Sequence, residues 1–102
     1  MSWTIYILRC SDDTLYTGIA KDVVRRVEEH NSGKRLASNY TRSRRPVMLV
    51  YQETAETQSE ALKREYAIKQ LTRKGKDALV REWGRRARGK RISAARKERS
   101  KA

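Results

Sequence analysis

Three short segments have the residue pattern of β-strands. Trp3–Arg9 and Leu15–Ile19 are rich in β-branched and aromatic residues, and the polar run Ser11–Thr14 separates them. We therefore expect an antiparallel hairpin with its turn at Ser11–Thr14. A third, mostly apolar segment, Val47–Gln52, predicts a well-buried strand.

A helix is predicted between the hairpin and the third strand. Asp22 is a good N-cap, and the helix extends to about Asn31. Val23, Val24 and Val27 form its apolar side. Before this helix, the sequence predicts a glycine turn at Gly18.

Two more helices follow the third strand. Thr57–Glu60 has the spacing of a capping box and opens a helix that runs to about Leu71. The apolar stripe of this helix consists of Ala61, Leu62 and Ile68. Thr72–Trp83 predicts a shorter helix that closes over the core.

The charge of the chain points to a polyanionic partner. The 102 residues carry 25 Lys and Arg against 12 Asp and Glu, a net charge of +13, which favours DNA, RNA or anionic lipid. Residues 84–102 hold nine of the basic residues and one acidic residue. We therefore expect one domain over residues 1–83 and a basic, disordered tail over 84–102.

Cysteine content and hydropathy restrict the cellular context. Cys10 is the only cysteine, which excludes an internal disulfide and a multi-cysteine zinc site. No apolar run approaches the ~18 residues of a membrane span, and no secretory signal is visible. The tail has almost no large apolar residues for membrane insertion, so membrane attachment is disfavoured. The expected compartment is the cytoplasm.

Tyrosine, arginine and histidine gather where the second strand leads into the first helix. Tyr16 lies near the end of that strand, and Arg26 and His30 project from one helix face because they are four residues apart. A phenol can pass a proton, an arginine fork binds phosphate and histidine does either. The alternatives are that Tyr6 and Tyr16 pack a core, that Arg26 is solvated and that His30 is a helix C-terminal cation.

The polar segment between residues 34 and 46 is a candidate nucleic-acid surface. It carries five cations, Lys34, Arg35, Arg42, Arg44 and Arg45, with Tyr40 among them. Cations interleaved with an aromatic ring suit a surface that follows phosphates and stacks a base. The alternative is a solvated loop.

Glu65 is an unusual residue for its position. It falls within the apolar stripe of its helix, between Leu62 and Ile68, where an uncompensated carboxylate would be costly to bury. It needs a cation, a hydrogen-bond network or a metal. The alternative is a salt bridge with Lys69, four residues later.

Together these residues resemble the GIY-YIG nuclease superfamily, and most closely its small stand-alone bacterial members. The resemblance covers roughly residues 3–80. The two signature tripeptides resemble Thr4-Ile5-Tyr6 and Tyr16-Thr17-Gly18. The family's arginine, histidine and metal-binding glutamate match Arg26, His30 and Glu65.

Other positions add to the resemblance or depart from it. Asn39-Tyr40-Thr41 and Arg44-Arg45-Pro46 resemble the segment before the third strand in the stand-alone group. Thr4 stands where the family name has glycine, and Thr17 replaces isoleucine. The asparagine that several family nucleases carry after the glutamate helix has no clear counterpart.

The resemblance implies a fold and a reaction. The fold is an α/β, more strictly α+β, arrangement in which helices flank a three-stranded antiparallel sheet. The implied reaction is metal-dependent hydrolysis of DNA phosphodiester bonds, in some relatives selective for DNA structure, with Mg²⁺ or Mn²⁺ as cofactor. The alternative is a DNA- or RNA-binding module without catalysis.

The resemblance also implies roles for five residues. Glu65 would hold the metal, and Arg26 would clamp the phosphate. Tyr16 is favoured as the group that deprotonates water, with Tyr6 in support, although the two roles could be exchanged. His30 would orient the phosphate or relay the proton.

Overall fold

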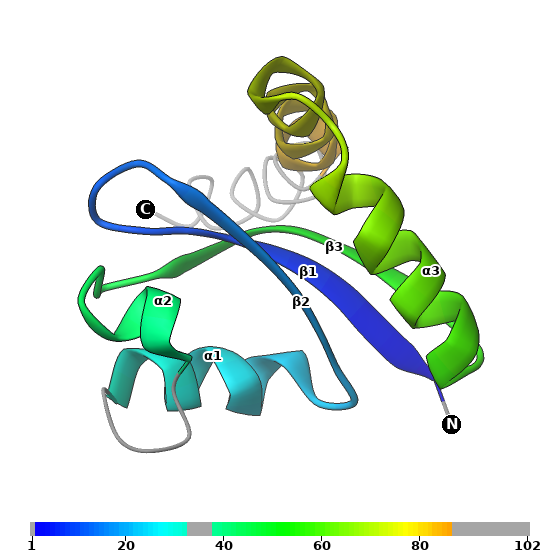
Figure 1. The fold of residues 1–102 in the computed structure, drawn as a ribbon, viewed down its shortest axis with the longest axis horizontal. Helices are drawn as coiled ribbons and strands as arrows, with labels where there is room; N and C mark the ends of the chain where they lie inside the picture. Colours follow the sequence, from blue (N-terminus) through cyan, green and yellow to red (C-terminus); the bar gives the residue numbers. More distant parts are fainter. Residues whose placement is uncertain (1, 33–37, 87–102) are drawn as a thin grey trace, which may run out of the picture.

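The computed structural model describes residues 2–32 and 38–86. The elements follow the order β1 (Trp3–Arg9), β2 (Leu15–Ala20), α1 (Val23–Ser32), α2 (Asn39–Arg42), β3 (Met48–Ala55) and α3 (Gln58–Lys69). A further helical segment covers residues 73–86. The antiparallel sheet has the order β2-β1-β3, so the first strand lies in the middle (Figure 1). The predicted fold class is confirmed.

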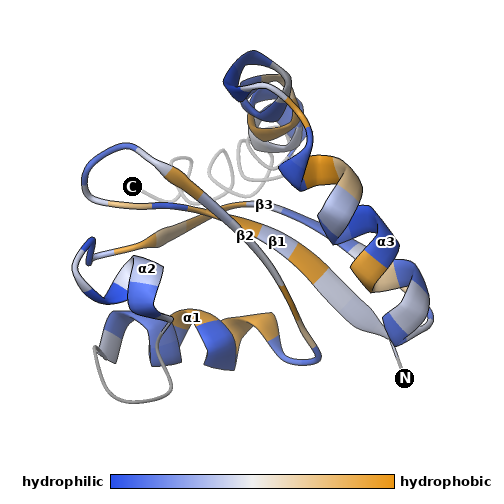
Figure 2. Ribbon diagram, in the orientation of Figure 1, coloured by the Kyte–Doolittle hydropathy of each residue, from blue (hydrophilic) through white to orange (hydrophobic). Residues whose placement is uncertain are grey.

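The central strand β1 divides the core into two halves. Successive side chains of a strand point to opposite faces. Ile5 and Ile7 therefore pack with Ile68 of α3 on one face, whereas Tyr6 and Leu8 belong to a second cluster on the other. Figure 2 shows hydrophobic segments along the strands and mixed character along the helices.

Each sheet face is covered by helices from a different part of the chain. Val23 and Val27 of α1 pack against the Tyr6 cluster. Leu79 and Val80 of the 73–86 helix pack, beside α3, against the Ile5 cluster. A β-bulge in β3 breaks its alternation, because Ile7 pairs with Tyr51 while Leu8 pairs with Leu49.

Side-chain caps begin the helices as their sequences predict. The Oδ1 atom of Asp22 accepts a hydrogen bond of 3.1 Å from the backbone N–H of Arg25. The hydroxyl of Thr57 accepts one of 3.1 Å from the backbone N–H of Glu60. These bonds satisfy N–H groups that have no partner within the helix.

Several expected details are wrong. Gly18 lies within β2 and is not part of a turn. Val24 and Leu62, predicted to be on apolar helix faces, are 66% and 47% exposed. Met48 of the third strand, expected to be well buried, is 67% exposed, although Val47 and Val50 of the same segment are 5% and 9% exposed.

The segments around residues 40 and 83 also differ from expectation. Residues 39–42, expected within a loop, form the short helix α2. The helix predicted over 72–83 covers 73–86 and continues past the expected domain boundary. Residues 87–102, most of the predicted tail, lie outside the described residues. Within the described segments, no helix is long and apolar enough to cross a bilayer.

Candidate active site

A buried hydrogen-bond chain links Tyr6, His30 and Thr41. The Tyr6 hydroxyl lies 3.0 Å from Nε2 of His30, and Nδ1 of His30 lies 2.7 Å from Oγ1 of Thr41. Tyr6 is 1% exposed, and His30 and Thr41 are fully buried. The chain therefore joins β1, α1 and α2 through side chains alone.

One assignment of protons accounts for this chain. Oγ1 of Thr41 can donate to the backbone carbonyl of Ser38 at 3.3 Å, and so accepts from Nδ1–H of His30. Nε2 of His30 then accepts from the Tyr6 hydroxyl. Burial, with the nearby charge of Arg26, lowers the pKa of His30 to about 4. His30 is therefore neutral at pH 7, which argues against its interpretation as a helix C-terminal cation.

Arg26 is placed beside the same hydroxyl. Its guanidinium hydrogen-bonds Tyr6 and pairs with Glu29 at 3.0 Å. Burial is the largest single influence on the pKa of Arg26 and lowers it, but the interactions with Glu29 and Tyr6 together outweigh burial, so this pKa is raised. The Arg26 side chain keeps 27% of its surface exposed, so it faces solvent at one end and the buried chain at the other.

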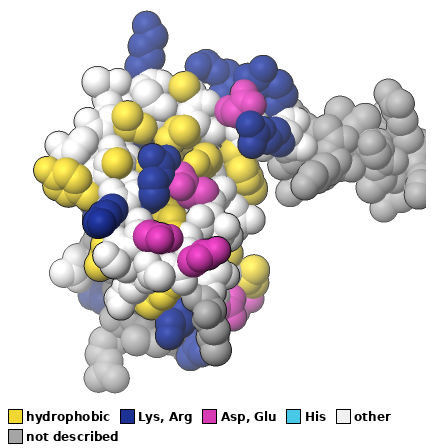
Figure 3. Space-filling model, turned by 90° about the vertical axis from the view of Figure 1, so that its right-hand side faces the viewer, with side chains coloured by type: hydrophobic (Ala, Val, Ile, Leu, Met, Phe, Trp, Pro, Cys, Tyr) yellow, Lys and Arg dark blue, Asp and Glu magenta, His cyan; other side chains and the backbone are white. Residues whose placement is uncertain are grey.

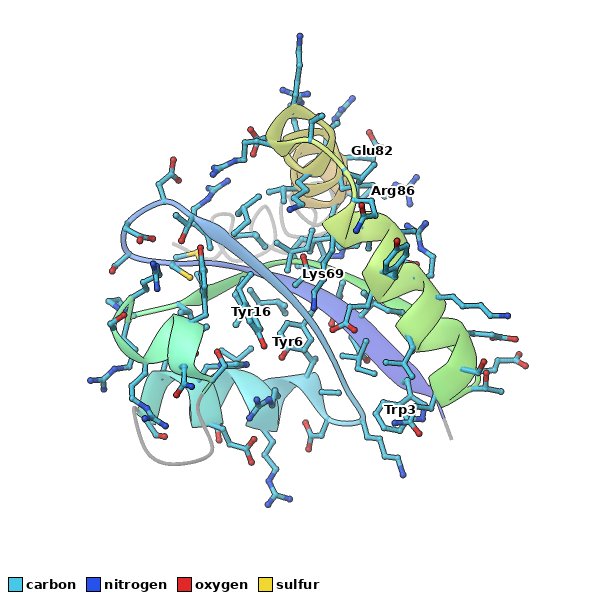
Figure 4. All side chains as sticks on the ribbon, in the orientation of Figure 1. Trp3, Tyr6, Tyr16, Lys69, Glu82 and Arg86 are labelled. Carbon is cyan, nitrogen blue, oxygen red and sulfur yellow. The ribbon has the colours of Figure 1, made fainter. Side chains whose placement is uncertain are left out.

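The two signature tyrosines differ in environment. Burial is the largest cause that raises the pKa of Tyr6 to about 12, with Tyr16 adding to it and Arg26 opposing it. Tyr6 therefore stays protonated at neutral pH. Tyr16, which is half-buried, has its ring centre 6.5 Å from that of Tyr6 and 5.3 Å from that of His30 (Figure 4).

Glu65 reaches the site from α3. Its charge is the weakest of the influences that raise the pKa of Tyr6. The Glu65 side chain is 19% exposed, and its Oε2 atom lies 3.5 Å from Nζ of Lys69, so the salt bridge considered as an alternative is present. In Figure 4 Lys69 extends toward the two tyrosines.

Glu65 is compatible with Mg²⁺ or Mn²⁺. Mg²⁺ commonly takes one or two protein carboxylates and completes its shell with water and substrate phosphate. Among residues 2–32 and 38–86, no three His, Cys, Asp or Glu side chains form a ready ligand group. Within the described residues the Glu65 carboxylate is partly exposed and pairs with an exposed lysine, which it can exchange for a metal ion.

Comparison with known proteins identifies the family. The model of the GIY-YIG catalytic domain matches residues 2–78. The chain belongs to the GIY-YIG family. This family is nuclease-like, and its nucleases are generally metal-dependent.

This GIY-YIG chain is similar both to proteins of known sequence and to solved structures. A UPF0213 protein of Desulfotalea psychrophila is 58% identical over 78% of this chain and 71% of its own length. One from Staphylococcus aureus is 60% identical over 76% and 93%. The solution NMR structure of a UPF0213 protein from Bacillus halodurans matches with TM-score 0.50 and 42% identity over 78% and 83% of the two chains. One of an E. faecalis protein matches with TM-score 0.55 and 39% identity over 82% and 88%.

The two GIY-YIG signature tripeptides meet across the β1–β2 pair. Tyr6 lies opposite Gly18 in the strand register. A Cβ atom at position 18 would lie 2.6 Å from the Tyr6 hydroxyl oxygen and 2.8 Å from its Cζ. Gly18 therefore has a steric role, because the Tyr6 phenol occupies the space that a side chain at position 18 would fill.

The predicted nucleic-acid residues fall into three groups. Lys34 and Arg35 lie outside the described residues. Arg42 and Arg45 are exposed, and Nε of Arg45 donates to the Arg42 carbonyl at 2.9 Å. Tyr40 and Arg44 are engaged with each other, because Cζ of Arg44 lies 4.1 Å from the centre of the Tyr40 ring.

The α3 side of the molecule does not single out a site of one charge. On the α3 side of the molecule, basic and acidic side chains lie next to one another (Figure 3). A groove between the 73–86 helix and the start of β3 is lined by Arg73, Val80 and Met48, among others, and by none of the five predicted catalytic residues.

Thr41 is a site residue that the sequence analysis missed. It follows His30 by eleven positions in a polar segment, and nothing in that spacing predicts contact. One local signal was available, since Ser38 caps α2 by accepting a hydrogen bond of 3.1 Å from the Thr41 backbone N–H. A serine three residues before Thr41 predicts the N-cap of a helical turn, and this turn is the one that buries Thr41.

Proposed function

We propose that this protein is a metal-dependent endonuclease that hydrolyses phosphodiester bonds in DNA. The observation that carries the proposal is the buried bond between Tyr6 and His30, with Arg26 on the same helix as His30 and the partly exposed Glu65 among the charges that act on Tyr6. A cation and a carboxylate that both act on one neutral phenol suit a site that binds a phosphate and a metal ion together. The net charge of +13 supports a nucleic acid as substrate.

Arg26 is the proposed phosphate clamp. Its fork offers donors in a geometry that matches two phosphate oxygens. At rest it is held by Glu29 at 3.0 Å, so the guanidinium is oriented before DNA arrives. As negative charge builds on the phosphate in the transition state, this fixed cation stabilises it without having to be reorganised.

Tyr16 is the proposed acceptor of the proton from water. Tyr6 is the poorer candidate, because its pKa of about 12 keeps it protonated and its proton is directed at His30. Complete burial of His30 favours a role in holding Tyr6, or in relaying its proton, over direct contact with the phosphate. Tyr6 and His30 would then be the uncharged, buried side of the site.

Glu65 is the proposed ligand of Mg²⁺ or Mn²⁺. A divalent cation bound there would neutralise charge on the scissile phosphate and stabilise the leaving oxygen. Glu65 keeps 19% of its side chain exposed, which leaves it accessible from solvent. Its partner Lys69 is 51% exposed, and an exposed ion pair of this kind is worth only a few tenths of a kcal/mol.

The test is cleavage of labelled linear, single-stranded and branched DNA in Mg²⁺, Mn²⁺ or EDTA. Arg26→Ala and Glu65→Gln should each lower metal-dependent cutting by about 10²–10³-fold. Arg25→Ala and Glu60→Gln are matched controls. Arg25 also pairs with Glu29, at 3.4 Å, but is 76% exposed, and Glu60 is an exposed glutamate of α3.

The outcomes separate the two candidate functions. Cutting that is lost in both site variants and kept in both controls supports the nuclease. Tight DNA or RNA binding by the wild type, with no cutting of any substrate, would favour the binding module. The ion pair between Glu65 and Lys69 is the observation that favours this second candidate, because it satisfies the carboxylate without a metal.

A further inference from the structure

The ring of Tyr16 lies in a stack that continues to the surface. Tyr40 of α2 is stacked on it, with ring centres 5.8 Å apart and planes at 29°. The guanidinium of Arg44 lies 4.1 Å from the centre of the Tyr40 ring. Tyr40 therefore has one partner in the candidate active site and another at the surface.

Arg44 is fixed by bonds to two other segments. Its Nε donates to Oδ2 of Asp12 at 3.0 Å, and its NH1 donates to the carbonyl of Tyr40 at 2.9 Å. Its own carbonyl accepts from the backbone N–H of Ser11 at 2.9 Å. Asp12 is held in turn, since its Oδ1 accepts from the backbone N–H of Thr14 at 3.1 Å and from its hydroxyl at 2.6 Å.

These contacts connect the turn before β2 with a side chain of β2 itself. Asp12 lies in the turn between β1 and β2, and β2 carries Tyr16. The path from Asp12 through Arg44 and Tyr40 therefore leads from the turn before β2 to Tyr16 within β2. Asp12 holds Arg44, Arg44 lies over the Tyr40 ring, and that ring stacks on Tyr16, so rotation of the Tyr16 side chain is restricted.

We propose that Tyr40 and Arg44, anchored by Asp12, are positioning residues that hold the Tyr16 phenol in its reactive orientation. This inference rests on the proposed function, in which Tyr16 takes the proton from water. It assigns Arg44 a different role from its neighbour Arg45. Nε of Arg44 already donates to Asp12 and its NH1 to the Tyr40 carbonyl, so the protein orients this guanidinium over the Tyr40 ring.

Kinetics of paired variants separate positioning from DNA binding. Arg44→Met and Arg45→Met each remove one positive charge from the same segment. Arg45 is exposed and donates to backbone carbonyls, from Nε to Arg42 at 2.9 Å and from NH1 to Asn31 at 3.5 Å. Arg44→Met should lower kcat about ten- to a hundredfold at saturating DNA, because a small misplacement of a reacting group has that effect. Arg45→Met should raise KM and leave kcat nearly unchanged.

The Tyr40 variants test the ring itself. Tyr40→Ala should lower kcat as Arg44→Met does, and Tyr40→Phe should restore it, because the stack needs the ring and not the hydroxyl. Tyr66→Ala is the matched control, since Tyr66 is 67% exposed on α3. It should cut DNA like the wild type.

Tyrosine ring NMR without DNA gives a readout that does not depend on cleavage. The ring signals of Tyr16 should shift in Tyr40→Ala and Arg44→Met and stay in place in Arg45→Met and Tyr66→Ala. Unchanged Tyr16 signals in the first two variants would overturn the proposal whatever the nuclease assay gives. Equal rises in KM for both arginine variants, with kcat intact, would also overturn it.

The same data distinguish this inference from the proposed function. If the wild type cuts DNA and Tyr16 does not respond, only the positioning role fails. If Tyr16 responds but the wild type cuts no DNA, the proposed nuclease fails, and the catalytic part of the positioning role fails with it.

Discussion

The buried neutral His30 makes stability depend on pH in a range where little else titrates. The chain has one histidine. The unfolded chain binds a proton on it below a pKa of 6.5, whereas the folded protein does so only below about 4. Between these values the unfolded state holds more protons, so the free energy of unfolding falls as the pH is lowered.

The size of this loss follows from the two pKa values. One pKa unit corresponds to about 1.4 kcal/mol, so the full effect is about 3 kcal/mol and about 2 kcal/mol is lost by about pH 5. Above about pH 7 the contribution is constant, because His30 is neutral in both states.

Urea unfolding between about pH 7.5 and pH 5 measures the effect, with the m-value checked for constancy. His30→Gln is the comparison, because its side chain keeps an amide near Tyr6 and Thr41 but does not titrate. The wild type should lose stability across this range, and the variant should not. A wild-type curve parallel to that of the variant would refute the reasoning. An NMR titration of the imidazole with its midpoint near about 6.5, the unperturbed value, would refute it as well.

Two further predictions concern Gly18 and the C-terminal segment. Gly18→Ala places a Cβ atom 2.6 Å from the Tyr6 hydroxyl oxygen, and should destabilise the fold by about 1–3 kcal/mol in thermal unfolding while displacing Tyr6 from His30. Gly75→Ala, whose nearest contact is Leu71, is the control for activity, and equal cutting by the two variants would contradict the steric role of Gly18. Truncation after Arg86 removes seven basic residues, and should weaken DNA binding and flatten its salt dependence, while leaving cutting at saturating DNA nearly intact. A truncated protein with an unchanged salt slope would exclude the tail as a source of affinity.

Local rules were sufficient for the three strands, for the starts of α1 and α3, and for part of the site. The caps at Asp22 and Thr57 are short-range features, so the sequence predicts them without knowledge of the fold. The four-residue spacing of Arg26 and His30 likewise determines that both face the Tyr6 hydroxyl once the helix packs on the sheet.

Contacts between distant segments could not be predicted in this way. Glycine favours turns and also close approaches between strands, and only the register opposite Tyr6 decides which applies at Gly18. The meeting of Thr41 with His30, and of Tyr40 with Tyr16, depends on how α2 sits against α1 and β2. An isolated polar segment carries no sign of that placement.

The candidate site separates neutral from charged groups according to burial. Tyr6, His30 and Thr41, at 1% exposure or less, are joined by hydrogen bonds between neutral groups. Burying a charge in their place would cost far more than burying a paired hydroxyl or imidazole. Arg26 and Glu65 stay partly exposed at the edge of this neutral chain. In the proposed function, the neutral side chains of His30 and Thr41 hold Tyr6 in place. Arg26 and Glu65 remain accessible from solvent to a phosphate and a cation.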